Sequence, residues 1–253
     1  RHPALEQWTG RRLGQDAALT TLGIQQAFSC EDLTKELPNL LSGKEAVYYT
    51  IGHHPVTDEI IFQVIDSLKK QVRRGVAAPS AIMDLEPIIS ELRLFKSPAE
   101  LELMRQAAKI SVAAHKKAMQ KCASLVYEYE LEAELLYEFS RLGCRSVAYD
   151  PIVGSGANAT ILHYTENNQA LHQGDLVLID AGGEYQNYAA DITRTFPVSG
   201  RFSPEQRAIY ELVLKAQKAA IAAIKPGIPW VQMQFIITTT LTQGLIELGI
   251  LKG

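Results

Sequence analysis

Leu176-Val177-Leu178-Ile179-Asp180-Ala181-Gly182-Gly183 is the stretch of sequence that decides the fold of the second part of this chain. It is an apolar run of strand length that ends in a carboxylate, which predicts a buried β-strand with Asp180 at its end. The stretch Gly182-Gly183-Glu184-Tyr185-Gln186-Asn187 can turn the chain back. A second strand then runs antiparallel to the first, and it is carried by Asp191-Ile192-Thr193-Arg194-Thr195-Phe196-Pro197.

This strand pair brings two carboxylates together. If the turn centres near Tyr185 and Gln186, Asp180 and Asp191 lie directly opposite one another, with their β-carbons about 4.5–5.5 Å apart. Two carboxylates this close repel one another unless a cation or a proton separates them. One divalent ion, or two ions about 3.5–4 Å apart, fits such a gap. A structural alternative stays open, in which Asp180 caps a turn and Arg194 neutralises one carboxylate in an ion pair.

The rest of the chain predicts an α/β (α+β) fold in two parts, because helical and strand-like patterns alternate along it. Residues 1–90 form a small α/β domain with a strand at 46–51 and a helix at about 57–74. Residues 91–98 form a linker that ends in a capping box, Ser97-Pro98-Ala99-Glu100. Beyond it we expect helices at about 98–121, 129–142, 204–224 and 230–248, with short strands between 148 and 198 that include 152–153 and 161–164.

Composition excludes several classes of protein. The chain has 253 residues, of which 47% are hydrophobic, and a net charge of −3, so it is neither disordered nor a strongly basic nucleic-acid binder. It has no apolar run of the roughly 20 residues that a membrane span needs. The three cysteines form no C-x-x-C pair and no disulfide framework, which favours a reducing, cytoplasmic location.

Other motifs carry a weaker signal. His163 follows the apolar residues 161–162 and is either a functional histidine or a hydrogen-bonded structural one. His53 and His54 are adjacent, so in an extended chain they point to opposite faces and do not both bind one ion. Residues 154–159 match G-x-G-x-x-A, but a dinucleotide site needs a helix directly afterwards, and the residues that follow favour a strand.

Four runs in order make the chain resemble a known family. They are Ile152-Val153-Gly154-Ser155-Gly156, Leu162-His163-Tyr164-Thr165-Glu166-Asn167, the run from Asp175 to Gly182, and the run from Asp191 to Pro197. Together they resemble aminopeptidase P (Xaa-Pro aminopeptidase), a pita-bread metallopeptidase, and the likeness extends to residues 10–18 and 83–98. It implies that part of a pita-bread (creatinase/aminopeptidase-like) domain follows the small N-terminal α/β domain.

The resemblance also implies roles for individual residues. Asp180 would bind one metal of a dinuclear centre, most consistent with Mn²⁺, and Asp191 would bridge both metal ions. His163 would be a catalytic residue that contacts the substrate near the scissile bond, and Tyr149 would lie beside the site and bind substrate. A metal-bridging hydroxide would attack the Xaa-Pro bond and release the N-terminal residue from peptides with proline in second position. The family assembles as homodimers or homotetramers, with no nucleic acid or membrane as partner.

One departure from the family pattern sets the remaining expectations. The family completes its metal site with a histidine and two glutamates from later strands, whereas the last histidine here is His172. We therefore expect an internal portion of the enzyme, with the N-terminal half of the pita-bread domain at 99–253, that binds metal weakly and does not turn over alone. The alternatives are a prolidase, which cleaves only Xaa-Pro dipeptides, and a non-catalytic pita-bread binding protein.

Overall fold

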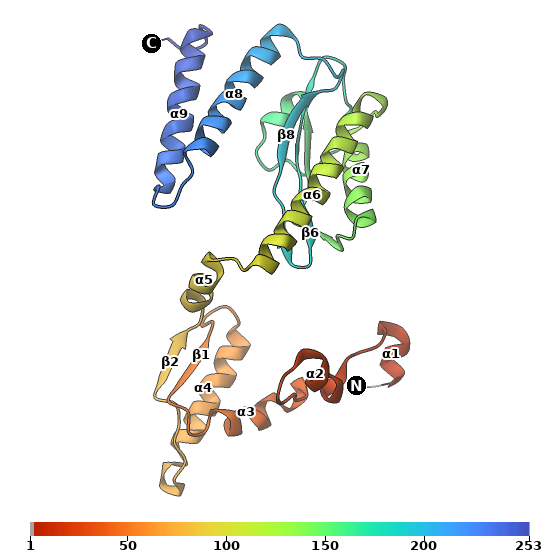
Figure 1. Ribbon diagram of the computed structural model, residues 1–253. Coiled ribbons are helices and arrows are strands. Elements are labelled where there is room, and N and C mark those ends of the chain that lie inside the picture. The colour runs from red at the N-terminus through yellow and green to blue at the C-terminus, as the bar shows by residue number, and fades with distance from the viewer. Residues whose placement is uncertain (1–2, 253) are drawn as a thin grey trace. The chain divides into compact units, whose positions relative to one another are not determined.

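The computed structural model describes residues 3–252, which fall into two compact units that divide between Phe95 and Lys96 (Figure 1). The first unit holds α1 (Pro3–Thr9), α2 (Gly14–Leu22), η1 (Cys30–Asp32), α3 (Leu33–Leu41), β1 (Ala46–Tyr49), α4 (Pro55–Lys69), η2 (Val72–Arg74), β2 (Ala81–Asp84) and α5 (Glu86–Leu94). The second unit contains all the remaining elements.

The first unit is built around a crossover between two parallel strands. β1 pairs with β2 in parallel, and α4 provides the connection that parallel strands require. One face of α4 is apolar and buried, through Ile61, Val64, Ile65 and Leu68. The predicted strand and helix are therefore present, although the α-helix ends at Lys69 and a separate 3₁₀ turn covers residues 72–74.

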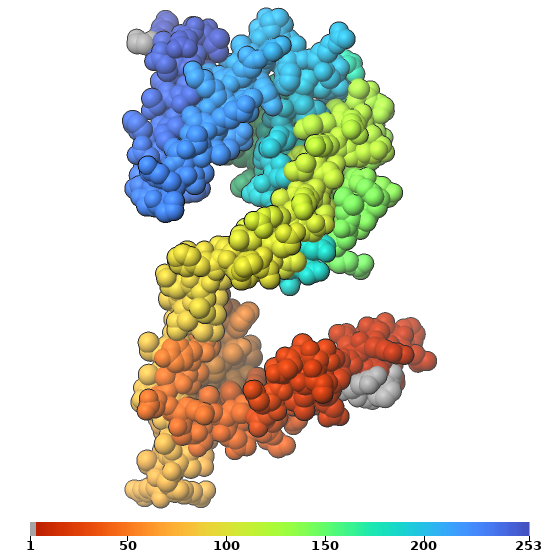
Figure 2. All heavy atoms as spheres, in the orientation of Figure 1, coloured from red at the N-terminus to blue at the C-terminus, as the bar shows by residue number. Residues whose placement is uncertain are grey.

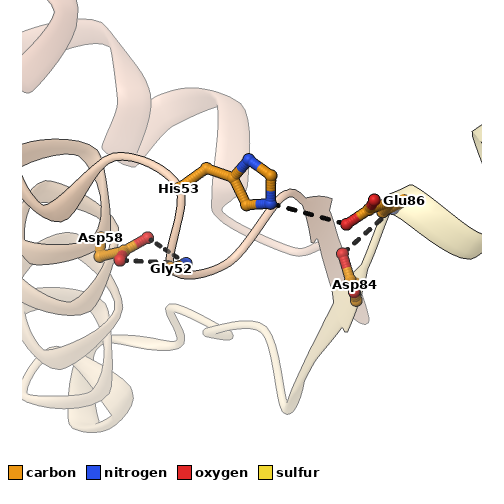
Figure 3. A network of polar contacts seen from close by, with 5 residues as sticks. All are labelled: Gly52, His53, Asp58, Asp84 and Glu86. Carbon is orange, nitrogen blue, oxygen red and sulfur yellow. Dashed lines mark hydrogen bonds and ion pairs between the residues drawn. The ribbon is translucent and has the colours of Figure 1, made fainter. Parts of the chain in front are cut away.

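The adjacent histidines lie in the loop between β1 and α4, and Figure 3 shows His53 there. His54 is the N-cap residue of α4, and Nε2 of His53 lies 3.6 Å from a carboxylate oxygen of Glu86, which begins α5. Asp58 accepts hydrogen bonds from the backbone N–H of Gly52 and from the hydroxyl of Tyr49. These contacts tie the loop to its own unit.

The second unit places two helices against one face of a small sheet. Its elements are α6 (Pro98–Lys121), η3 (Cys122–Ser124), α7 (Glu128–Arg141), β3 (Ser146–Val147), β4 (Ile152–Ser155), η4 (Gly156–Thr160), β5 (Leu176–Asp180), β6 (Gly183–Tyr185), β7 (Tyr188–Ala189), β8 (Thr193–Pro197), α8 (Pro204–Ala223) and α9 (Trp230–Glu247). β4, β5 and β8 form one antiparallel sheet in that order, and β3, β6 and β7 form another.

The core of this unit lies between the helices α6 and α7 and the sheet of β4, β5 and β8. It contains Ile110, Ala114, Ala118, Leu131, Leu135, Phe139, Val153, Val177 and Ile179, all of them buried. α8 and α9 contact one another as a helical pair, in blue in Figures 1 and 2. Both α6 and α8 begin as predicted, with a serine capping box followed by proline.

The predicted strand at residues 161–164 is wrong. The 3₁₀ helix η4 ends at Thr160, and residues 161–163 form a bend and a turn. Leu162 is 88% exposed, so the apolar letters of this run do not mark a buried strand. Since only a 3₁₀ turn follows the glycines at 154 and 156, the dinucleotide-binding geometry is also absent from this described segment.

Within residues 3–252, none of the helices combines the length and the apolar composition needed to cross a membrane.

The packing of Phe139 predicts a stability difference on one helix. Phe139 is 2% exposed in the core, while Tyr137 on the same helix is 60% exposed. We expect Phe139→Ala to lower the free energy of unfolding by about 3–5 kcal/mol, because it leaves a cavity. Tyr137→Ala should stay within about 0.5 kcal/mol of the unaltered chain. Urea denaturation of both variants measures this, and equal effects would contradict the assigned core.

Candidate metal centre

Strand β5 directs Asp180 away from the helices. Val177 and Ile179 are buried in the core with α6 and α7, whereas Asp180 is half-buried. Because successive side chains in a strand point to opposite faces, Asp180 lies on the face of the sheet that α6 and α7 do not cover.

The register of the strand pair differs from the prediction by two residues. Asp180 pairs with Thr193, and the same register continues through hydrogen bonds from Ala181 N–H to Ile192 O and from Ala190 N–H to Gly183 O, each 3.1 Å. Asp191 therefore lies opposite residue 182, as a diagonal neighbour of Asp180. Since a shift of two residues preserves the face, both carboxylates still point to the same side of the sheet.

The turn between β6 and β7 explains the shift. Tyr185 pairs with Tyr188, so the turn residues are Gln186 and Asn187, with φ values of 48° and 68°. These left-handed conformations are typical of two-residue hairpin turns. The turn is thus centred one residue later than the sequence predicted, and each later residue moves by two positions relative to its partner.

Gly182 allows the two chain segments to approach one another closely beside Asp180. A β-carbon at this position would lie 1.7 Å from the carbonyl oxygen of Ala190. The glycine is therefore required by the close approach of two backbones, and not by a left-handed conformation.

Tyr149 links the two carboxylates. Its hydroxyl group lies 2.5 Å from Oδ1 of Asp180 and 3.1 Å from Oδ1 of Asp191, so one proton is shared between two acceptors. Burial is the largest cause that raises the pKa of Tyr149 above its ordinary value, followed by the hydrogen bond to Asp180 and the charges of both aspartates. The hydroxyl therefore stays protonated and can offset part of the repulsion between the carboxylates.

These residues surround one cleft, which also contains His163. The cleft has a volume of about 310 Å³ and is lined by Tyr149, Asp150, Ile152, His163, Thr165, Asp180 and Asp191. The four residues that the sequence analysis singled out as site residues are therefore together. Asp150 and Thr165 were not singled out; Asp150 directly follows Tyr149 and Thr165 lies two residues after His163, so closeness in sequence to these two residues is the signal that indicates them.

The carboxylate pair fits a divalent ion as part of a ligand set. Two acidic side chains converge on one hydroxyl group, and carboxylate oxygen is a donor that hard divalent ions favour. The ion pair of the structural alternative is absent within residues 3–252, where Arg194 contacts neither aspartate as an ion pair and instead donates to the carbonyl of Thr193. Within the same residues there is no cluster of three or more histidine, cysteine, aspartate or glutamate side chains suited to a metal.

Helix α6 supports this strand pair from behind. His115 and Ser111 are both buried and lie one helical turn apart. Nε2 of His115 donates to the carbonyl of Ala181 at 3.0 Å, and Oγ of Ser111 accepts from the N–H of Gly183 at 3.0 Å. Burial lowers the pKa of His115, which keeps its ring neutral, and its buried Nδ1 has no partner among the described residues. The helix thus fixes the backbone between the two aspartates.

Comparison with known proteins identifies related families over most of the chain. Residues 102–251 match the model of metallopeptidase family M24, and residues 1–48 match the N-terminal domain of aminopeptidase P. An Xaa-Pro aminopeptidase from Escherichia coli is 44% identical over 98% of this chain and 56% of its own length. One from Haemophilus influenzae is 46% identical over 100% of this chain and 56% of its own length.

Solved structures of aminopeptidase P also resemble this chain. A zinc-substituted E. coli aminopeptidase P in complex with product superposes with a TM-score of 0.96 at 44% identity, over 100% of this chain and 57% of that one. The chain therefore spans just over half the length of the relatives it matches.

The shared hydroxyl predicts that Tyr149 stabilises the metal-free site. We expect Tyr149→Phe to lower the free energy of unfolding by about 1–3 kcal/mol in the presence of a chelator, because both carboxylates lose a donor. Urea denaturation measures the effect, and Tyr137→Phe is the matched control on an exposed ring. Equal stability of the two variants would show that the hydroxyl does not hold the carboxylates together.

Proposed function

The chain belongs to metallopeptidase family M24, and from this we propose that the whole protein is a metal-dependent aminopeptidase, a hydrolase that removes the N-terminal residue from peptides with proline in second position. The observation that carries the proposal is the convergence of Asp180 and Asp191 on one face of the sheet, in a cleft that also contains His163. The named relatives, both Xaa-Pro aminopeptidases, support the choice of substrate.

The proposed cofactor is a pair of divalent metal ions, with Mn²⁺ as the native metal. Asp180 would hold one ion and Asp191 would bridge both. Oxygen-rich sites favour hard ions such as Mn²⁺, which supports manganese, and the zinc-substituted E. coli relative supports a divalent ion more generally. When bound, such ions lower the pKa of water, so that hydroxide is available near neutral pH.

The side chains of this chain have separate tasks in the proposed site. Asp180 and Asp191 supply negative charge that holds the cations, and Tyr149 keeps both carboxylates directed to one point through its hydroxyl. His163 lines the cleft from a different segment and would contact the substrate beside the scissile bond. A peptide bond before proline has no N–H, so a cleft that recognises it has to rely on shape and on the carbonyl group.

The remaining parts of the proposal concern the whole protein. Residues 1–90 would form the N-terminal domain, 91–98 the linker, and 99–253 the N-terminal half of the pita-bread domain. Helix α5 runs through Leu94 and α6 begins at Pro98, so only residues 95–97 of this linker lie outside a helix. The further metal ligands and the general base would come from a region of the whole protein that corresponds to the part of the relatives that this chain does not cover. We also propose a cytoplasmic homodimer or homotetramer that acts on peptides.

The bridging role of Asp191 predicts a loss of metal on an isosteric change. In the whole protein, Asp191→Asn should lower the metal content from two ions per chain to one or fewer, because a neutral amide replaces a charged bridging group. The value of kcat/KM for a proline peptide should fall by at least about a hundredfold. Elemental analysis and peptide hydrolysis measure these effects, with the exposed Asp66→Asn as control. Unchanged metal content and activity would remove Asp191 from the centre.

Substrate length separates the proposed activity from its alternatives. We expect the Mn²⁺-loaded whole protein to release the N-terminal residue from peptides of three or more residues with proline second. Cleavage of Xaa-Pro dipeptides alone would make the protein a prolidase. Binding of proline peptides without hydrolysis, at full metal loading, would make it a pita-bread binding protein. Mass spectrometry of the reaction products distinguishes the three outcomes.

A further inference from the structure

Glu128 is a buried carboxylate that the proposed chemistry does not use. It is the first residue of α7 and is 0% exposed. Its Oε1 accepts hydrogen bonds from Ser155 N–H (2.7 Å), Ser155 Oγ (3.0 Å) and Asn158 Nδ2 (3.3 Å), and its Oε2 accepts from Tyr164 Oη (2.8 Å) and Gln169 N–H (3.0 Å). These donors replace the water that a buried carboxylate loses.

All five donors belong to the segment 155–169, which runs through the cleft wall. His163 and Thr165, which line the cleft, flank Tyr164, whose hydroxyl donates to Glu128. The segment contains only the short 3₁₀ helix η4, and His163 itself is exposed. His163 lies outside regular secondary structure. Its position therefore depends on the contacts that fix Tyr164 and the two ends of the segment, Ser155 and Gln169.

Asn167 provides a second anchor for the same segment. It is 1% exposed and adopts a left-handed conformation, with φ at 47°. Its Oδ1 accepts from Val153 N–H, and its Nδ2 donates to the carbonyl of Pro151 and to Glu132, each at 2.9 Å. Asn167 thus ties the segment that carries His163 to β4 and to α7.

We propose that Glu128 is a positioning residue for the cleft: it acts through the segment 155–169 to hold His163 against the substrate. The predicted effect on activity rests on the proposed peptidase function. The claim that Glu128 holds the segment 155–169 in place does not. Helix α7 favours a negative charge at this position, because its N-terminal end carries a partial positive charge.

The arrangement requires a carboxylate at this position and excludes the isosteric amide. Ser155 N–H faces one oxygen of Glu128 and Gln169 N–H faces the other, and a backbone N–H can only donate. In Glu128→Gln, either orientation of the amide therefore sets an NH₂ group against a backbone N–H. The amide loses one of these bonds and leaves buried donors unpaired.

Glu130 is a matched control on the same turn of α7. Among the described residues, only its Oε2 accepts hydrogen bonds, from Val126 N–H and Tyr127 N–H, as part of the capping box. Glutamine also occurs at this position of capping boxes, since its single carbonyl oxygen can take both bonds. Glu130→Gln makes the same chemical change on the same helix but leaves the segment 155–169 untouched.

The experiment compares Glu128→Gln, Glu130→Gln, His163→Ala and the double variant Glu128→Gln/His163→Ala in the Mn²⁺-loaded whole protein. Hydrogen exchange should speed up within 155–169 in Glu128→Gln and not in Glu130→Gln. The value of kcat/KM for a proline peptide should fall at least about tenfold in Glu128→Gln, because small misplacements of a substrate-contacting group are costly. The double variant should be no slower than His163→Ala alone, since the two changes act through one group.

Additive losses in the double variant would overturn the proposal, because Glu128 would then act by a route other than His163. Equal exchange and equal activity in the two glutamine variants would overturn it as well. If Glu128→Gln does not fold, Tyr164→Phe removes one of the five bonds and is subject to the same two criteria. If the unaltered protein cleaves no proline peptide, the peptidase function fails, while hydrogen exchange still decides whether Glu128 holds the segment.

Discussion

The antiparallel register of β5 and β8 is the constraint on which the candidate site depends. It pairs Asp180 with Thr193 and so brings Asp191 to the same face of the sheet, beside the hydroxyl of Tyr149. A slip of one residue would move Asp191 to the opposite face and separate the two charges. The close approach at Gly182 and the hydrogen bonds from Ala181 and Ala190 fix this register just where the carboxylates lie. The site is therefore a property of strand pairing as much as of two acidic residues.

Two helices on the buried side of the sheet use buried hydrogen bonds to hold the two parts of the chain that form the cleft. These parts are the strand pair with the aspartates and the segment with His163. Through His115 and Ser111, α6 makes buried hydrogen bonds to the backbone between the aspartates. Through Glu128, α7 makes them to the segment that carries His163. Buried polar side chains are costly unless they are paired, so each fixes its partner segment in one position. The apolar core between helices and sheet supplies stability, and these few polar contacts determine where the cleft residues lie.

The sequence predicted those features that depend on short-range signals. The helix starts at Pro98 and Pro204 are set by local capping boxes, and the pairing of two aspartates on one face follows from strand periodicity. The predicted register was wrong by two residues. The register depends on Gln186 and Asn187 adopting left-handed conformations, which their neighbours in the sequence do not specify. Residues 161–164 have the letters of a strand, but the hydroxyl of Tyr164 is held by Glu128, which lies 36 residues earlier in the chain. The roles of Tyr149 and His163 came from family resemblance, and only the structure relates them to a shared cleft.

The central claim is that Asp180 and Asp191 together hold metal ions on the open face of the sheet. Anomalous X-ray scattering from crystals of the whole protein grown with Mn²⁺ tests this claim most directly. The account predicts two anomalous peaks about 3.5–4 Å apart, one in contact with Asp180 and both in contact with Asp191. Full occupancy of Mn²⁺ at other residues, with the hydroxyl of Tyr149 still bridging the two carboxylates, would contradict it.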